Sequence, residues 1–459
     1  MVTFAIDLGN KWLKMKSARG EYTYPASYLE ASNVSNRNVF HQEEEDPNHT
    51  FRVDQEAYRF IWGEDLKRYQ LDNQLINTYA QSNRLKQGKT IRILKFALAK
   101  LALDYVKDVK GPLEVKLILG VSLSDNPANK SMMAYMKDLL VNLHRIEVDG
   151  RMVEVKIEDE SSCLIFPQYL GTLLHASFND ELELNPNYSR GRVGIVDIGG
   201  GTIQMNQVIG MNPSMMAFER FEGVQKLINR IAQQIGSTKL HAVERCLMQE
   251  QPPYLYNEGL SPHMARDITT VVNESKVAYT RFTVASLLSE YFPNFVDFEA
   301  IIVTGGGAHL LDREALEEEL GIENYQRLVF LNDAQVANVR GFYKEARIYW
   351  GEEVLPVKQK NAPKKFFKDN PQPWPEATHQ RVTSPELTVG VSTGLKDPST
   401  ENALGQDLKK VQENLSTLEG TSDFFQREEA NAQAPTSPSF YEASEIINKL
   451  NQDLDQSLF

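Results

Sequence analysis

The strongest constraint on the fold is a strand and turn pattern that occurs twice, at residues 4–10 and 194–202. In each copy an apolar run reaches an aspartate, Asp7 or Asp197, and then turns at glycine. Short apolar runs bounded by glycine are typical of buried strands. Glycine lets backbone amides approach an anion closely. The pattern therefore predicts two strand-turns that hold a polyphosphate from two sides.

Either turn alone is more typical of an ordinary tight turn, but a third glycine run strengthens the interpretation. The apolar run 300–304 leads into Gly305, Gly306 and Gly307, and a helix is expected to begin near His309. A nucleoside can lie against a backbone without side chains. An aspartate beside such a turn is suited to hydrated Mg²⁺, because it would repel the phosphate itself. The common dinucleotide signature and the Gly-Lys-Ser or Gly-Lys-Thr loop are both absent.

Short apolar runs at 115–119, 193–198 and 300–304 alternate with segments of helical periodicity, including 81–110. This alternation predicts an α/β architecture, and 459 residues suffice for two or three folding units. The net charge of -13 disfavours general binding to nucleic acid or anionic lipid. Cys163 and Cys246 fit neither a zinc site nor a disulfide framework. We find no signal peptide or membrane-spanning segment and expect a cytoplasmic protein with no direct membrane insertion.

The composition changes after Trp350, and nine of the 20 prolines lie in residues 352–459. We expect residues 351–459 to be a largely disordered tail. Two features stand out within it: a basic and aromatic cluster at 364–368, and apolar residues at helical spacing that predict a short amphipathic helix at 439–459. The acidic residues of this helix would be repelled by anionic lipid, which favours a protein partner. The alternative is a helix that folds back on the body.

Five motifs follow one another in a fixed order, at residues 7–14, 168–171, 197–202, 305–307 and 337–341. In this order the chain resembles the actin superfamily of ATPases, over roughly residues 1–350. The stretches around Asp7 and Lys14, 303–308 and 338–341 are most similar to the ParM (StbA) type of bacterial actin-like protein.

The resemblance implies an α/β, actin-like (ribonuclease H-like) two-domain ATPase fold. Domain I would span residues 1–175, with a smaller subdomain at about 24–110. Domain II would span residues 176–332, with a smaller subdomain at about 223–291. A return helix to domain I would occupy residues 333–350.

The resemblance also implies a site for ATP and Mg²⁺. The β-phosphate would be contacted by Gly9, Asn10 and Lys14, the γ-phosphate by Gly199, Gly200, Gly201 and Thr202, and the nucleoside by Gly305, Gly306 and Gly307. Asp7 and Asp197 would hold Mg²⁺ through water. Gln168 is the candidate that positions the attacking water, with Glu158 and Glu160 as alternatives. Further adenine and ribose contacts are expected between residues 223 and 282, where the spacing does not choose among Lys226, Asn273, Glu274 and Lys276.

The function that the resemblance implies is slow ATP hydrolysis coupled to self-assembly into filaments, used in plasmid or DNA segregation through a DNA-bound adaptor protein. The alternative is a membrane- or partner-associated cytoskeletal scaffold of the FtsA or MreB type. A heat-shock-type chaperone would need a folded domain after the ATPase body, and a sugar kinase would need a carboxylate aimed at a hydroxyl. Neither feature is evident in the sequence. The choice between ATP and GTP stays open.

Overall fold

The computed structural model describes residues 1–351, except for 35–49, 65, 67–73, 80–83, 126, 128, 214–216, 250 and 259–264. All described residues belong to one compact unit of the chain. The predicted cluster at 364–368 and the predicted helix at 439–459 lie outside the described residues, as does the predicted tail beyond Gly351.

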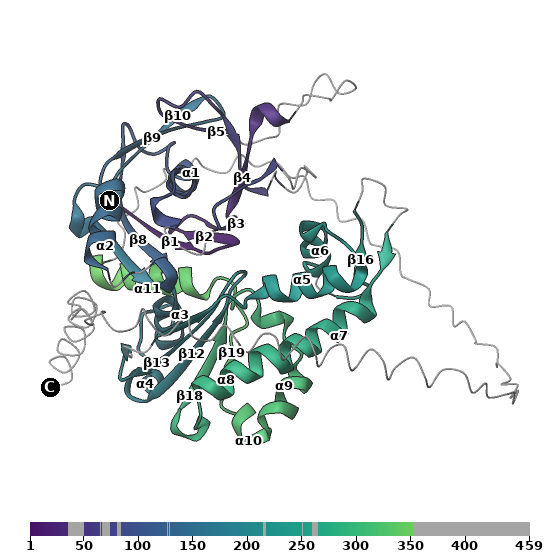
Figure 1. Ribbon diagram of the computed structural model, residues 1–459. Helices are drawn as coiled ribbons and strands as arrows, with labels where there is room; N and C mark the ends of the chain where they lie inside the picture. The colour runs from purple at the N-terminus through teal and green to yellow at the C-terminus, as the bar shows by residue number, and fades with distance from the viewer. Residues whose placement is uncertain are drawn as a thin grey trace, which may run out of the picture. The chain divides into compact units, whose positions relative to one another are not determined.

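The first sheet contains the N-terminal strand and is mixed, with antiparallel hairpins on both sides of a parallel centre (Figure 1). Its strands, in sheet order, are β3 (Glu21–Pro25), β2 (Trp12–Lys16), β1 (Val2–Leu8), β8 (Leu113–Val121), β10 (Arg151–Lys156), β9 (Leu143–Val148), β5 (Thr50–Val53), β6 (Phe60–Ile61), β4 (Ser27–Glu30) and β7 (Ile76–Asn77), and β11 (Cys163–Pro167) also pairs with β8.

Strand β1 lies between β2 and β8, and all seven of its residues are buried. It runs parallel to β8 and antiparallel to β2, and the second pairing places Asp7 opposite Lys14. A strand covered on both faces reads as a nearly continuous apolar run, which Thr3 and Asp7 interrupt here. Helix α1 (Gly88–Leu103) packs on the sheet through residues such as Phe96 and Leu98. It is shorter than the predicted helix 81–110, since Arg84–Lys86 form a separate 3-10 turn, η4, and turns follow Leu103.

The second sheet has β12 at its centre, antiparallel to β13 and parallel to β18. Its strands are, in order, β14 (Asn212–Pro213), β13 (Ile203–Ile209), β12 (Arg192–Ile198), β18 (Ala300–Thr304) and β19 (Leu328–Phe330), with β15 (Phe218–Arg220) also paired to β13. A separate two-stranded sheet consists of β16 (Leu255–Tyr256) and β17 (Arg266–Asp267).

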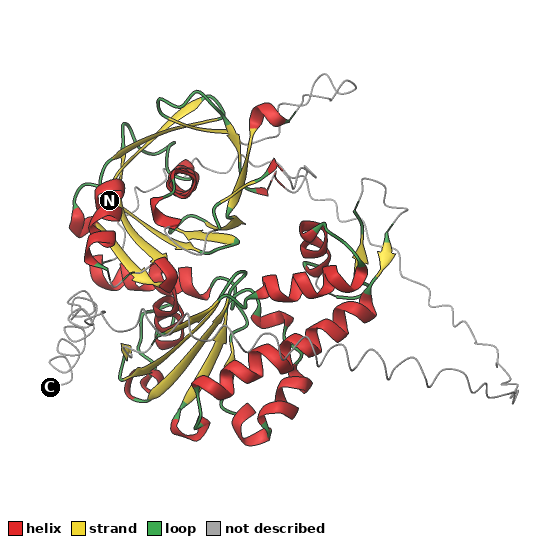
Figure 2. Cartoon of the chain, in the orientation of Figure 1, coloured by secondary structure: helices red, strands yellow, loops and turns green. Residues whose placement is uncertain are grey.

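Helices share a hydrophobic core with this second sheet (Figure 2). They are α5 (Val224–Ile235), α6 (Leu240–Leu247), α7 (Thr269–Tyr279), the π-helix η8 (Thr280–Ala285), α8 (Ser286–Tyr291), α9 (Arg313–Leu320) and α10 (Ile322–Tyr325). The helix expected near His309 begins later, because Ala308–Leu310 form a 3-10 turn and Asp312 then caps α9 through a side-chain bond to the amide of Ala315.

Two helices from distant parts of the chain, α3 (Gln168–Ser177) and α11 (Ala337–Trp350), share a core with residues of β1, β8 and β12. Glycines lie where they cross. A Cβ on Gly341 would lie 1.7 Å from the carbonyl oxygen of Gly171, and a Cβ on Gly171 would lie 2.4 Å from the carbonyl oxygen of Asn338. The close approach explains why each helix accepts a glycine, which costs stability in a helix interior.

The α/β class expected from the alternating pattern is confirmed, and α11 lies within the predicted return helix at 333–350. Two further helices complete the set, α2 (Lys130–Leu140) and α4 (Pro186–Arg190). No helix in the described ranges is both long and apolar enough to cross a membrane.

Candidate functional site

The first glycine turn joins β1 to β2. Its start is tight, with the amide of Gly9 donating to the carbonyl of Asp7 at 3.0 Å. A Cβ at position 9 would lie 2.2 Å from the carbonyl oxygen of Trp12, so only glycine fits. The ammonium of Lys14 contacts Oδ2 of Asp7 at 3.1 Å. The turn therefore requires glycine at its start and carries a lysine beside its aspartate.

The second glycine turn joins β12 to β13 and is tied to the start of α5. The amide of Gly199 donates to the carbonyl of Thr202 at 2.8 Å, and the amides of Val224 and Gln225 donate to the carbonyls of Gly199 and Gly200 at 3.0 and 2.8 Å. The first amides of α5 therefore bond to the turn and fix its shape.

The two turns meet through Lys11, a residue that the sequence reasoning did not select. A Cβ on Gly200 would lie 2.7 Å from the side-chain carbons of Lys11. The ammonium of Lys11 reaches Glu244 Oε2 on α6 at 3.0 Å. One side chain from the first turn thus crosses the second turn.

The two aspartates lie deep in this arrangement, with Asp7 fully buried and Asp197 6% exposed. Gln168 Nε2 donates to Asp7 Oδ1 at 2.6 Å, and Asn338 Nδ2 donates to Asp197 Oδ2 at 2.7 Å. Burial raises the pKa of Asp197; the nearby Lys14 opposes this and the charge of Asp7 reinforces it. Two buried carboxylates therefore share one close cation.

Gln168 begins α3 directly after Pro167 and is buried beside the aspartates. Its Oε1 accepts a hydrogen bond from Gln204 Nε2 at 3.0 Å. The alternatives lie elsewhere: Glu158 pairs with Lys156 at 3.3 Å on the surface, and the side chain of Glu160 is 76% exposed. Of the three candidates, the fold brings Gln168 to the aspartates.

Nine of the predicted residues line one small pocket of about 40 Å³: Gly9, Asn10, Lys14, Gln168, Asp197, Gly199, Gly200, Thr202 and Gly306. Asp7 lies behind it, bonded to Gln168 and Lys14. Gly305 and Gly307 support the second turn: a Cβ on Gly305 would lie 2.3 Å from Asp197, and the amide of Gly307 donates to Ile198 at 2.8 Å. Gly201 instead faces a neighbouring cavity of about 300 Å³.

A larger pocket of about 670 Å³ adjoins the small one, and both are lined by Lys11, Trp12, Gly200, Gly306 and Gln335. Among the candidates for adenine and ribose contacts, Lys276 lines this larger pocket and donates to the hydroxyl of Tyr254 at 2.7 Å.

The other three candidates lie away from the larger pocket. Lys226 is exposed and pairs with Glu222 at 2.9 Å, and Asn273 and Glu274 are exposed on α7. Polar residues are common on exposed surfaces, so the polarity of these three residues does not indicate a ligand contact.

Several site residues escaped the sequence reasoning: Lys11, Trp12, Gln204, Gln335 and Glu244. Gln204 lies in β13, which also contains Asn206 and Gln207, so the local pattern did not single it out. Its Oε1 is buried without a hydrogen-bond partner in the structure. A buried polar atom of this kind indicates room for a water or a ligand. For Glu244, 233 residues from Lys11, the local pattern gave no signal.

The residues fit a phosphate-bound magnesium ion better than a metal held by protein alone. Within the described ranges, no group of three or more His, Cys, Asp or Glu side chains gathers to hold a metal. Mg²⁺ usually keeps several waters and binds one or two carboxylates plus substrate phosphates. Asp7 and Asp197, with Lys14 close to both, provide this kind of partial site.

Residues 5–171 match the family model described as the actin like proteins N terminal domain. No curated protein matches the sequence. The fold is similar to that of several solved structures. The ParM protein of pSK41 is 18% identical with a TM-score of 0.56, and the match covers 76% of this chain and 97% of that one.

Two other solved structures are similar over 76% of this chain and 99% of theirs. A 15-stranded ParM filament from Clostridium botulinum is 14% identical with a TM-score of 0.57. The archaeal actin homologue Ta0583, solved in complex with ADP, is 16% identical with a TM-score of 0.53. The expected resemblance and fold class are thus confirmed: the chain carries an actin-like N-terminal domain at residues 5–171, and it has the actin-like fold.

Proposed function

We propose that this protein binds and hydrolyses ATP with Mg²⁺ and assembles into filaments in a nucleotide-dependent way. The observation that carries the proposal is the meeting of two glycine turns, two buried aspartates and Gln168 at one small pocket beside a larger one. The small pocket would take the terminal phosphates, and the larger one the nucleoside.

In this proposal the phosphates are held mainly by backbone amides of the two turns and by the Lys14 ammonium. Asp7 and Asp197 would hold Mg²⁺ through water, and the ion would neutralise charge on the phosphates. Gln168 would orient the attacking water, since phosphoryl transfer depends chiefly on positioning and charge stabilisation. Its Nε2 bond to Asp7 and its Oε1 bond from Gln204 fix the amide for this role.

Filament formation is supported by the likeness to a ParM filament structure, and nucleotide binding by the likeness to an actin homologue solved with ADP. ATP would favour the assembling conformation, and hydrolysis would weaken subunit contacts. We further propose plasmid or DNA segregation as the task. With a net charge of -13, the link to DNA would run through a DNA-bound adaptor protein.

The deciding experiment is light scattering and pelleting of the purified protein with Mg-ATP, with Mg-ADP and without nucleotide, together with phosphate release. We expect polymer with Mg-ATP, phosphate release that follows assembly, and neither process when Asp197 is replaced by alanine. Arg145→Met is the matched surface control, because the Arg145 ion pair with Glu154 is exposed and lies within one hairpin. Phosphate release by a protein that stays monomeric at high concentration would reject the filament and leave an ATPase or kinase.

The segregation role needs its own test. Filaments assembled with candidate DNA-binding adaptors and labelled DNA should move or align that DNA in reconstitution. Failure of adaptor-bound DNA to follow the filaments would reject this role while leaving ATP-driven assembly intact.

A further inference from the structure

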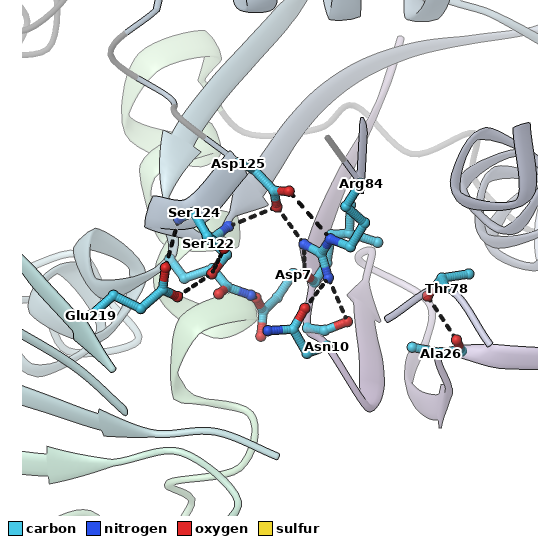
Figure 3. A network of polar contacts seen from close by, with 12 residues as sticks. Asp7, Asn10, Ala26, Thr78, Arg84, Ser122, Ser124, Asp125 and Glu219 are labelled. Atoms are coloured by element: carbon cyan, nitrogen blue, oxygen red, sulfur yellow. Dashed lines mark hydrogen bonds and ion pairs between the residues drawn. The ribbon is translucent and has the colours of Figure 1, made fainter. Parts of the chain in front are cut away.

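A buried arginine packs against the first glycine turn (Figure 3). Arg84 comes from the 3-10 turn η4 and is 1% exposed. It forms an ion pair with Asp125, which is also buried. A buried ion pair contributes little net stability compared with apolar residues of the same shape. Its contacts with the turn therefore need an explanation beyond stability.

The Arg84 guanidinium holds three successive residues of the first turn. It donates to the carbonyl of Leu8 at 2.9 Å, to the carbonyl of Gly9 at 3.2 Å and to Oδ1 of Asn10 at 2.7 Å. Its remaining contacts are with the two carboxylate oxygens of Asp125. Arginine offers five N–H donors in a fixed planar array.

This contact decides which way the Asn10 amide points. Arginine has donors and no acceptor, so Asn10 must present its oxygen to Arg84. The amide nitrogen then lies on the other side, and Figure 3 shows it directed away from Arg84. Asn10 lines the small pocket. An N–H donor on the pocket side of this residue suits an anion such as a phosphate.

Asp125 also links Arg84, through hydrogen bonds, to residues of the second sheet. It accepts from the amide of Ser122 at 3.3 Å, and the hydroxyl of Ser122 donates to Glu219 on β15. Glu219 also accepts from Gln204 at 3.1 Å, the residue that donates to Gln168. The Arg84 and Asp125 pair thus belongs to a network of polar contacts that runs from the first turn to Glu219 of the second sheet (Figure 3).

We infer that Arg84 is a positioning residue for phosphate binding: it holds the first turn and orients Asn10 so that the amide nitrogen donates to a nucleotide phosphate. This inference rests on the proposed function. It makes a claim that a purely structural role does not, because loss of Arg84 should weaken binding of phosphate-bearing ligands and spare the nucleoside.

The test compares ADP with adenosine by calorimetric titration. Arg84→Met alone would leave Asp125 buried and unpaired, which can prevent folding. The main variant is therefore Arg84→Met with Asp125→Leu, because an apolar pair is tolerated where an ion pair is buried. We expect ADP affinity to fall about tenfold, the range for losing one hydrogen bond to a charged group, with adenosine affinity unchanged. Arg84→Lys should recover part of the loss.

Asn10 supplies the second arm. Asn10→Asp replaces the donor with an acceptor and adds an opposite charge beside Arg84. We expect its melting temperature to be unchanged or raised and its ADP affinity to fall about a hundredfold, with adenosine unchanged. Asn10→Ala should weaken ADP binding in the wild type and have little further effect in the Arg84→Met and Asp125→Leu background.

The control is a second arginine and carboxylate pair that does not touch the turn. Arg92 contacts Glu56 at 2.8 Å, and Arg92→Met with Glu56→Leu should leave binding of both ligands unchanged. Three outcomes would overturn the inference and leave the proposed function intact. The Arg84→Met and Asp125→Leu variant could lose equal affinity for ADP and adenosine, or lose affinity for neither. Alternatively, Asn10→Ala could weaken ADP binding as much in that background as in the wild type. If the wild type binds neither ligand, the proposed function fails and the inference falls with it.

Discussion

The two glycine turns occupy equivalent places in their sheets but are held in different ways. The first is fixed by side chains: Arg84 donates to Leu8, Gly9 and Asn10, and Lys14 contacts Asp7. The second is fixed by backbone contacts. The start of α5 bonds to the carbonyls of residues 199 and 200, and the third glycine run packs against Ile198.

This difference determines which substitutions each turn tolerates. A turn held by charged side chains should respond to changes of charge and hydrogen bonding at positions far away in the sequence. A turn held by close backbone contacts should respond to added atoms, even a single methyl group, because no side chain can move aside. The predictions below test this contrast.

The largest effect is expected for Asp197→Asn at the second turn. Loss of the carboxylate should lower ATP hydrolysis by about a thousandfold, because Asp197 would hold the Mg²⁺ that neutralises charge on the phosphates in the transition state. The free energy of unfolding, in contrast, should rise in Asp197→Asn. Since burial raises the pKa of Asp197, the native state binds the proton more tightly than the unfolded state, and stability falls as pH rises from the ordinary to the raised pKa.

Phosphate release and thermal unfolding at pH 5, 7 and 8 check this prediction. The asparagine variant should be more stable than the wild type at pH 8, with a smaller difference at pH 5. Equal stability of both proteins at every pH would contradict the assignment of Asp197 as a buried, destabilising charge.

A methyl group near the second turn should have the next largest effect. In Gly223→Ala the new Cβ would lie 2.5 Å from the carbonyl oxygen of Gly199 and 2.6 Å from the amide of Thr202. Both are backbone atoms, so the turn must move, and we expect ADP affinity to fall about a hundredfold, at the upper end of overpacking costs. Gly88→Ala is the control, because no atom lies within 4 Å of its Cβ. Normal ADP binding by Gly223→Ala would show that the second turn is not rigid.

An intermediate effect is expected for the side chain that joins the two turns. The Lys11 and Glu244 pair is partly buried, with side chains 18% and 19% exposed. Lys11→Met should speed release of a fluorescent ADP analogue about tenfold, between the small effect of exposed ion pairs and the large effect of buried ones.

Exchange of the two charges, Lys11→Glu with Glu244→Lys, distinguishes this bridge from direct phosphate contact by Lys11. The exchanged pair should restore slow release in stopped-flow measurements if the bridge matters. If it instead releases ADP faster than Lys11→Met does, Lys11 binds the phosphate itself.

The smallest effect is expected within the third glycine run. A Cβ on Gly306 would have ordinary contact with Gln335 Cγ at 3.8 Å, whereas a Cβ on Gly307 would lie 2.5 Å from Ile198. Gly306→Ala should therefore leave the melting temperature unchanged, and Gly307→Ala should lower it, because only the second Cβ is overpacked. Equal melting temperatures for both variants would contradict this difference in packing.

The sequence by itself determined the features that depend on neighbours in the chain. The strands at 193–198 and 300–304, the glycine turns and the aspartates at strand ends were all predictable, because burial of an apolar run and the freedom of glycine are local properties. The order of five motifs also led to the actin-like fold. Gly171 and Gly341 belong to the motifs at 168–171 and 337–341. Glycine is required there because the backbones of α3 and α11 approach closely where they cross.

Only the tertiary structure decided which side chains complete the site. Arg84 with Asp125, Gln204 with Gln168, and Lys11 with Glu244 are pairs of residues 41, 36 and 233 positions apart. Likewise, Lys226 was as plausible as Lys276 until α5 and α7 placed the first in solvent and the second beside the larger pocket. The physical reason is that side-chain contacts follow from strand order and helix packing, which bring together residues whose local sequence carries no sign of their partner.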